Sequence, residues 1–227
     1  MKYIEFGQNK TLVSNIVLGC MRIPKLSTDE VIKFLDTASS VGINMLDTAD
    51  VYSQGKSEEL LGEAFLKSKG MRERFFVQTK CGIRKNPHLY DFSKEHIINS
   101  VEGSLKRLKV DYIDSLILHR PDPLMEPEEV GEAFNQLYKE GKVLNFGVSN
   151  MNPLQMELLQ QGLDFKICAN QVQFSVCHTP MINQGINVNM YNNPAIYRDG
   201  GILEYCRIHK IVVQAWSVLQ HGFFEGV

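Results

Sequence analysis

The feature that most constrains the fold is a regular alternation of short apolar segments with longer amphipathic segments. Seven apolar segments have the length and composition of buried strands. They cover residues 16–19, 43–46, 75–80, 112–119, 143–148, 168–172 and 211–216. Helical spacing of apolar residues predicts helices that begin near residues 27, 57, 93, 127, 152 and 202. Strands joined by helices through short loops indicate an α/β fold with parallel strands and helical crossovers.

Two architectures of parallel strands fit this alternation. No G-x-G-x-x-G follows the first strand, which counts against a doubly wound dinucleotide fold. We therefore expect a (β/α)8 TIM barrel with seven strands visible and the eighth βα unit missing. We expect residues 1–227 to form a single, C-terminally incomplete barrel domain.

Two segments lie outside the βα rhythm. Residues 3–6 and 10–13 flank Gly7-Gln8-Asn9, which predicts an N-terminal β-hairpin. The segment Asn183–Gly201 is rich in Asn and Gly and contains Pro194, and we interpret it as a long loop. The sequence leaves the role of this loop open.

Composition excludes several classes of function. A net charge of −2 provides no broad basic field for nucleic acid or an acidic membrane. No apolar run reaches the ~18 residues of a membrane span, and the N-terminus does not resemble a secretory signal. The five cysteines are scattered and the histidines lack metal-ligand spacing, so we expect reduced thiols, no metal site and a cytoplasmic location. We expect a monomer or weak homo-oligomer that acts on a small molecule.

Polar residues end most of the predicted strands. Asp47, Lys80 and His119 each follow or end a strand, and Tyr52 lies on the loop after Asp47. Other strand ends carry Ser149, Asn150, Gln171 and Trp216. Each residue alone has an ordinary structural explanation, such as a solvated strand end or a core histidine. In a parallel barrel, however, all strand carboxyl ends meet at one face, so we expect a shared site there.

The residue types suit proton transfer coupled to hydride transfer. A tyrosine hydroxyl has a pKa near 10, which is too high for efficient acid catalysis at neutral pH. An ammonium group ~4 Å away would attract a phenolate by about 4 kcal/mol at an effective dielectric constant of ~20. We therefore expect Lys80 to lower the pKa of Tyr52 and Asp47 to keep Lys80 charged. His119 would donate a hydrogen bond to a carbonyl oxygen of the substrate.

Three further residues suit a nicotinamide ring. The side-chain amides of Asn150 and Gln171 can each donate and accept, as recognition of a carboxamide requires. The face of Trp216 can stack on a planar ring. A planar ring that carries a carboxamide describes nicotinamide.

Together these motifs resemble the aldo-keto reductase family, and in particular its bacterial YdhF-like oxidoreductases. The matching segments are residues 42–52, 79–82, 108–114, 119–123, 141–150, 170–173 and 215–217. They extend over almost the whole chain. The resemblance implies a (β/α)8 barrel that uses NADP(H) to reduce an aldehyde or ketone to an alcohol.

The resemblance also implies roles for individual residues. Tyr52 would donate the proton, and Asp47, Lys80 and His119 would complete a catalytic tetrad. Residues expected to contact the cofactor are Gly19, Cys20, Met21, Asp47, Ser149, Asn150, Gln171, Trp216, Ser217 and Leu219. Val218 and Gln220 replace the Pro and Gly that are usual in this last segment of the family.

Other functions stay open at this point. Some family members keep the barrel and the cofactor but serve as redox-sensing or partner-binding modules with little turnover. Members of the family are also usually longer, so an inactive, truncated fragment is a third reading. The complete set of Asp47, Tyr52, Lys80 and His119 favours catalysis. The sequence does not decide the substrate, the preference for NADPH over NADH, or the oligomeric state.

Overall fold

Seven parallel strands form one sheet in the computed structural model, which describes residues 1–196 and 200–219. The strands pair in the order β11-β10-β9-β8-β5-β4-β3, and every neighbouring pair is parallel. Their bounds are β3 Leu18–Gly19, β4 Met45–Asp47, β5 Phe76–Cys81, β8 Ser115–Leu118, β9 Phe146–Ser149, β10 Ala169–Gln173 and β11 Val212–Trp216. The predicted α/β fold with seven parallel strands is confirmed.

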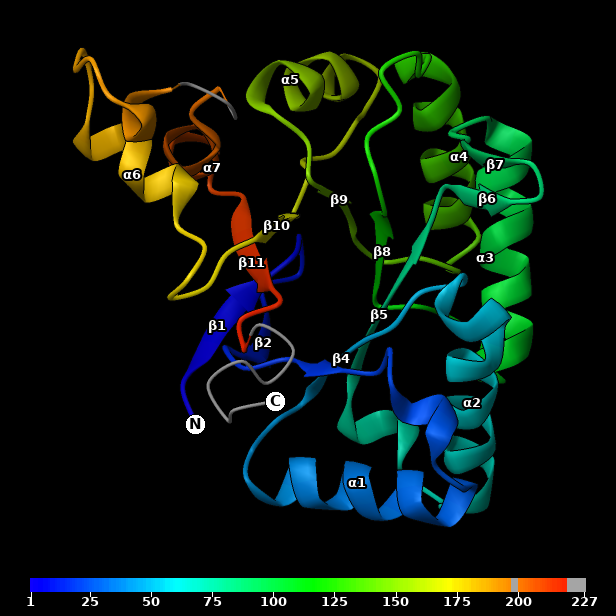
Figure 1. The fold of residues 1–227 in the computed structure, drawn as a ribbon. Coiled ribbons are helices and arrows are strands. Elements are labelled where there is room, and N and C mark those ends of the chain that lie inside the picture. The colour runs from blue at the N-terminus through cyan, green and yellow to red at the C-terminus, as the bar shows by residue number, and fades with distance from the viewer. Residues whose placement is uncertain (197–199, 220–227) are drawn as a thin grey trace.

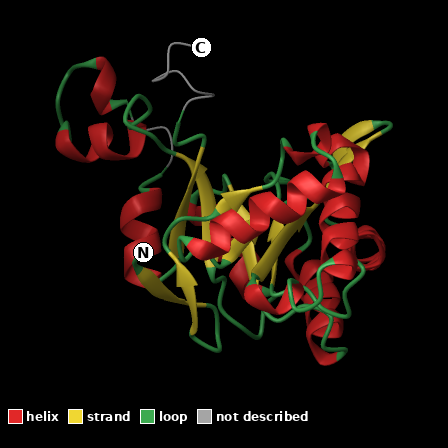
Figure 2. Cartoon of the chain, turned by 90° about the horizontal axis from the view of Figure 1, so that it is seen from below, coloured by secondary structure: helices red, strands yellow, loops and turns green. Residues whose placement is uncertain are grey.

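Helices follow one another around the outside of this sheet (Figure 1). The six that were expected are α1 Thr28–Ser40, α2 Lys56–Lys67, α3 Lys94–Leu108, α4 Pro127–Lys139, α5 Pro153–Gln161 and α7 Ile202–His209. Capping boxes at Ser27 and Asn152 begin α1 and α5, because the side chain of each cap accepts from a backbone N–H of the first turn. Figure 2 shows helices on both sides of the strands.

The sheet is strongly curled, because side chains from strands far apart in its order meet in its interior. Gln171 on β10 donates to Asp47 on β4 at 2.8 Å, although three strands separate β10 from β4 in the sheet. Gln78 on β5 donates to Gln214 on β11 at 2.9 Å. Strands β3 and β11 form the two edges, and no ladder joins them among the described residues. The arrangement is that of a (β/α)8 barrel without its eighth unit.

An N-terminal hairpin covers the end of the sheet at which the strands begin. Its antiparallel strands are β1 Tyr3–Phe6 and β2 Thr11–Ser14, as expected. Phe6 and Val13 pack with Met45 and Phe76 in a small buried core, and the rings of Phe6 and Phe76 meet edge to face at 5.3 Å. This core closes the amino end of the barrel, which leaves the carboxyl end of the strands for chemistry.

The structure differs from the sequence expectation in two regions outside the main sheet. Residues 183–201 are not one loop, because α6 Pro180–Ile186 extends into them and the 3-10 helix η4 covers Asn193–Ala195. Pro180 at the first helical turn is the signal that favours α6. A second hairpin, β6 Ile83–Lys85 and β7 His88–Tyr90, follows β5 and was not expected. Its turn lacks the Asn-Gly or Asp-Gly pair that marks hairpins in a sequence.

The strand predicted over residues 112–119 is shorter than expected. Ser115–Leu118 form β8, and Ile113 makes only an isolated bridge to Val143. Short 3-10 helices also occur at Ile23–Lys25 (η1), Tyr52–Gly55 (η2) and Arg72–Arg74 (η3). Among the described residues, no helix has the length and apolar character that crossing a bilayer requires.

Candidate active site

The ammonium group of Lys80 connects three of the four expected catalytic residues. Its Nζ donates to Asp47 Oδ2 at 2.6 Å, to the carbonyl oxygen of Thr48 at 2.7 Å and to Tyr52 Oη at 3.2 Å. Lys80 is buried, with 1% of its side chain exposed. Buried ammonium groups require such partners, because an unpaired charge in the interior is costly.

Backbone hydrogen bonds explain how Tyr52 reaches Lys80. After β4 the chain continues along β5, where Thr48 N donates to Gln78 O and Asp50 N donates to Lys80 O. Tyr52 then begins η2. This pairing delivers the tyrosine beside the end of β5, as the five-residue spacing from Asp47 suggested.

The segment that carries Tyr52 has a strained backbone. Ser53 and Gln54 have φ values of 48° and 58°, in the left-handed region that residues with a Cβ seldom adopt. Gly55 follows at φ 87°, and Arg107 packs where its Cβ would be. The surrounding structure therefore fixes the direction in which the tyrosine enters the site.

The charges around Tyr52 differ from the sequence expectation. Burial raises the pKa of the Tyr52 hydroxyl, and the Lys80 ammonium opposes this rise only in part. Asp47 also raises the pKa of Tyr52, because its carboxylate offsets the field of Lys80. Lys80 thus lowers the pKa of Tyr52 as expected, but burial outweighs this contribution, so the net shift is upward and the hydroxyl stays protonated at neutral pH. Burial opposes the charged form of Lys80, but Asp47 and Tyr52 outweigh it and raise the pKa of Lys80.

His119 packs against the ring of Tyr52. The two rings meet edge to face with centroids 5.6 Å apart. Burial lowers the pKa of His119 to about 3, and the positive charge of Lys80 contributes to this shift. The imidazole is therefore neutral at pH 7, and its buried Nδ1 has no partner among the described residues. A neutral imidazole can donate a hydrogen bond without competing with Tyr52 as the proton source.

A layer of glutamines lies beneath the tetrad in the barrel interior. Asp47 Oδ1 accepts from Gln78 and from Gln171, each at 2.8 Å, and both glutamines bond to Gln214. These bonds fix the carboxylate of Asp47 and leave its other oxygen for Lys80. Gln78 and Gln214 were not among the expected site residues. Strand alternation could have found Gln78, because residues two apart such as Gln78 and Lys80 face the same side.

A buried ion pair supports the strand that carries Lys80. Glu58 on α2 is fully buried, accepts from Thr79 Oγ1 on β5, and accepts from Arg107 Nε on α3 at 2.7 Å. Thr79 precedes Lys80, so this contact fixes β5 from its outer side. Asp50, near the same pair, has a pKa raised to about 7, first by burial and then by the carboxylate of Glu58.

The expected nicotinamide-binding residues also come together. Trp216 Nε1 donates to Asn150 Oδ1 at 3.2 Å, Asn150 Nδ2 donates to Ser149 Oγ at 2.7 Å, and Ser149 Oγ donates to the carbonyl oxygen of Gln171. Asn150 has a φ of 58°, which Asn tolerates better than most residues. The chain of bonds joins the ends of β9, β10 and β11.

This cluster can accommodate a carboxamide. Gln171 Oε1 accepts no hydrogen bond from the residues that the structure describes, and Asn150 Nδ2 uses one of its two hydrogens. Gly19 is exposed, and a Cβ placed there would meet nothing within 4 Å. A free acceptor, a free donor and open space at the end of β3 fit the nicotinamide end of a dinucleotide.

The remaining expected cofactor residues have more varied positions. Met21 is exposed, whereas Cys20 is fully buried and its burial raises the pKa of its thiol to about 12. Ser217 follows β11 with a φ of 59°, and Leu219 is 66% exposed. Gln220, one of the two departures from the family pattern, lies outside the described residues. Met21, Ser217 and Leu219 thus lie at the surface or in loops. Their contact with the cofactor stays a prediction.

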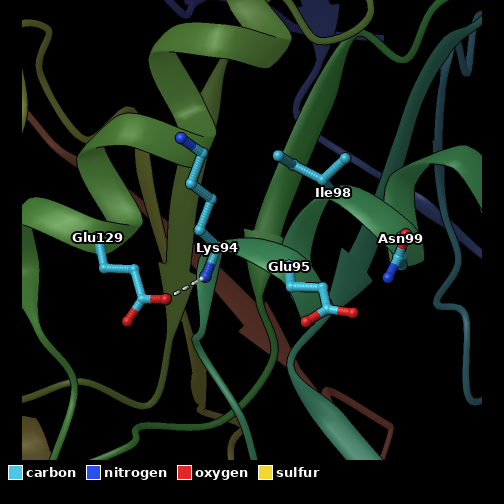
Figure 3. Close-up of a pocket in the computed structure, with 5 residues that line it drawn as sticks. All are labelled: Lys94, Glu95, Ile98, Asn99 and Glu129. Atoms are coloured by element: carbon cyan, nitrogen blue, oxygen red, sulfur yellow. Dashed lines mark hydrogen bonds between the residues drawn. The ribbon is translucent and has the colours of Figure 1, made fainter.

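A hollow on the outer helical layer lies apart from this site. Lys94, Glu95, Ile98 and Asn99 on α3 line it together with Glu129 on α4 (Figure 3). The backbone N–H of Lys94 donates to Glu129 there at 3.0 Å. The part of the chain that the structure describes contains no cluster of His, Cys, Asp and Glu that could hold a metal ion.

The sequence of this chain is similar to that of known oxidoreductases. The sequence pattern of the Aldo/keto reductase family matches residues 15–227. Oxidoreductase YdhF of Escherichia coli is 38% identical over 76% of this chain and 60% of its own length. The uncharacterized oxidoreductase YcsN of Bacillus subtilis is 37% identical over 92% of this chain and 68% of its own length.

A solved structure agrees with these sequence matches. An aldo-keto reductase from Klebsiella pneumoniae, solved in complex with NADPH, superposes with a TM-score of 0.75 at 27% identity. The superposition covers 97% of this chain and 69% of that one. The chain therefore corresponds to part of the length of its relatives, and it belongs to the aldo/keto reductase family.

Proposed function

We propose that the protein reduces an aldehyde or ketone to an alcohol with NADPH, and that residues 1–227 act as one barrel domain. The observation that carries this proposal is the position of the Lys80 ammonium between the carboxylate of Asp47 and the hydroxyl of Tyr52. This arrangement has no evident structural need, because a buried ion pair gives little net stability over apolar residues of similar size. It does stabilise a tyrosinate as the proton leaves.

Each of these residues has a separate role in the proposed reaction. Bound nicotinamide would supply the hydride. Tyr52 would give its proton to the oxygen of the substrate carbonyl, since Lys80 Nζ donates to Tyr52 Oη and leaves the hydroxyl hydrogen free. Lys80 would then stabilise the phenolate, and the neutral imidazole of His119 would orient the carbonyl oxygen by a hydrogen bond.

Residues at the ends of β9, β10 and β11 would hold the nicotinamide. Ser149, Asn150 and Gln171 would bind the carboxamide, and Trp216 would stack on the ring. The complex of the Klebsiella pneumoniae relative with NADPH supports the choice of cofactor. Gly19, Cys20 and Met21 would follow the cofactor from the end of β3, and Ser217 and Leu219 from the end of β11.

Fluorescence of the single tryptophan tests this function directly. Because Trp216 is the only tryptophan, saturable quenching on titration with NADPH would report binding at the proposed site. A panel of aldehydes, followed by the loss of NADPH absorbance, then measures turnover. Absence of both quenching and turnover, from protein shown to be folded by circular dichroism, would refute the proposal. Quenching without turnover on any aldehyde or ketone would favour the redox-sensing module instead.

A further inference from the structure

The mouth of the site contains a guanidinium group that the proposed mechanism does not use. Arg120 directly follows His119 at the end of β8, and it is half-buried. Its guanidinium carbon lies 5.6 Å from the centroid of the Trp216 ring. The side chain therefore reaches from β8 across the mouth toward β11, over the strand ends that carry the nicotinamide-binding cluster.

No carboxylate of the described residues neutralises this charge. The ion pairs formed by the described residues do not include Arg120. Asp122, the acid nearest in sequence, accepts instead from the backbone N–H of Leu124 at 3.0 Å. A half-buried arginine without an acidic partner among the described residues is unusual, because within them only the aromatic face of Trp216 offsets the desolvation of its charge.

The charge is also close to the reacting centre. The positive charge of Arg120 is one of the causes that lower the pKa of His119, so its field reaches the imidazole. A substrate carbonyl group held between Tyr52 and His119 would therefore lie near a cation, because Arg120 directly follows His119, the residue proposed to bind the carbonyl oxygen. In a dinucleotide the phosphates are separated from the nicotinamide by a ribose, so an anion at this end belongs more naturally to the substrate.

We propose that Arg120 binds a carboxylate of the substrate, and that the protein prefers aldehydes or ketones that carry such a group. The planar fork of a guanidinium matches a carboxylate with two parallel hydrogen bonds. This inference rests on the proposed reductase function and specifies its substrate class. Another cation beside this site, Lys85 on β6, is already engaged, because its Nζ donates to the carbonyl oxygen of Val51 at 2.8 Å.

A matched pair of substrates tests the proposal. The probes are 4-carboxybenzaldehyde and its methyl ester, which differ by one negative charge at the same distance from the aldehyde. We expect the protein to favour the acid in kcat/KM. Replacement R120Q should lower kcat/KM for the acid about ten- to hundred-fold and change that for the ester less than about threefold. R120K should restore part of the loss, since it keeps the charge but not the fork.

Three outcomes would overturn the inference. The first is an equal loss for both substrates in R120Q. The second is an equal loss for the acid in K85M, which would show a general field and not a specific contact. The third is an unchanged preference together with a weaker affinity for NADPH by calorimetry, which would assign Arg120 to the cofactor. Failure of the unaltered protein to reduce either aldehyde, or any other carbonyl compound, would count against the reductase function itself.

Discussion

Replacement of Lys80 by Met removes the cation that stabilises a tyrosinate at position 52. Lys80 Nζ lies 3.2 Å from Tyr52 Oη. At an effective dielectric constant of ~20, a full phenolate charge at this distance is stabilised by about 5 kcal/mol. The carboxylate of Asp47, 2.6 Å from the same Nζ, cancels part of this field. The phenolate is also only partly formed in the transition state, so we expect a net effect of about 3 kcal/mol, or roughly a hundred-fold lower kcat.

The assay is steady-state oxidation of NADPH with an aldehyde that the unaltered protein reduces. Circular dichroism and quenching of Trp216 by NADPH establish that the K80M protein folds and binds the cofactor. The matched control is K94M, because Lys94 forms an exposed ion pair with Glu132 on the outer helical layer. A folded, cofactor-binding K80M protein with a kcat within about threefold of the unaltered value would refute the role of Lys80.

Three further predictions concern stability. The pKa of His119 is lowered to about 3 from the ordinary 6.5, so only the unfolded state binds this proton between those values. Stability should therefore fall as the pH drops below about 6.5, and H119Q should flatten that fall in urea midpoints; an unchanged slope would contradict it. Asp50 has a raised pKa of about 7, so its contribution is full below about pH 4 and is lost as the pH rises through 7. D50N should thus raise the urea midpoint at pH 8 relative to the unaltered protein and have less effect at pH 5; an equal change at both values would exclude the titration. Replacement G131A should cost several kcal/mol, because its Cβ would overlap the carbonyl oxygen of Gly162, whereas G185A, whose Cβ has only an ordinary contact, should cost nothing or stabilise by ~0.5–1 kcal/mol. Equal melting temperatures for G131A and G185A would show that α4 and α5 can separate freely.

The strands and helices could be predicted because their patterns are local. Capping residues such as Ser27 and Asn152 and apolar runs such as Leu116–Leu118 determine their own structure through nearest neighbours. The β6–β7 hairpin could not be predicted, because its turn has no standard signature and its strands are exposed and short. The α6 helix was missed because Asn and Gly residues reduce its helical propensity, while Met181 and Gln184 are buried.

The convergence of the expected residues could be predicted, but the electrostatics around them could not. Parallel strands bring their carboxyl ends together, so Asp47, Lys80 and His119 had to converge once the fold was assigned. The pKa of Tyr52 depends instead on the balance of burial against two opposite charges, which no spacing in a sequence reveals. The bonds of Gln171 to Asp47 and Gln214 depend on the curl of the whole sheet.

The most direct test of the account is the turnover of Y52F, measured beside its affinity for NADPH. This change removes only the hydroxyl that Lys80 contacts and keeps the ring that packs against His119. The account predicts that reduction of every accepted aldehyde falls by about a hundred-fold or more while the NADPH titration of Trp216 stays the same. Undiminished reduction by Y52F would contradict the account, because the proton would then come from another group.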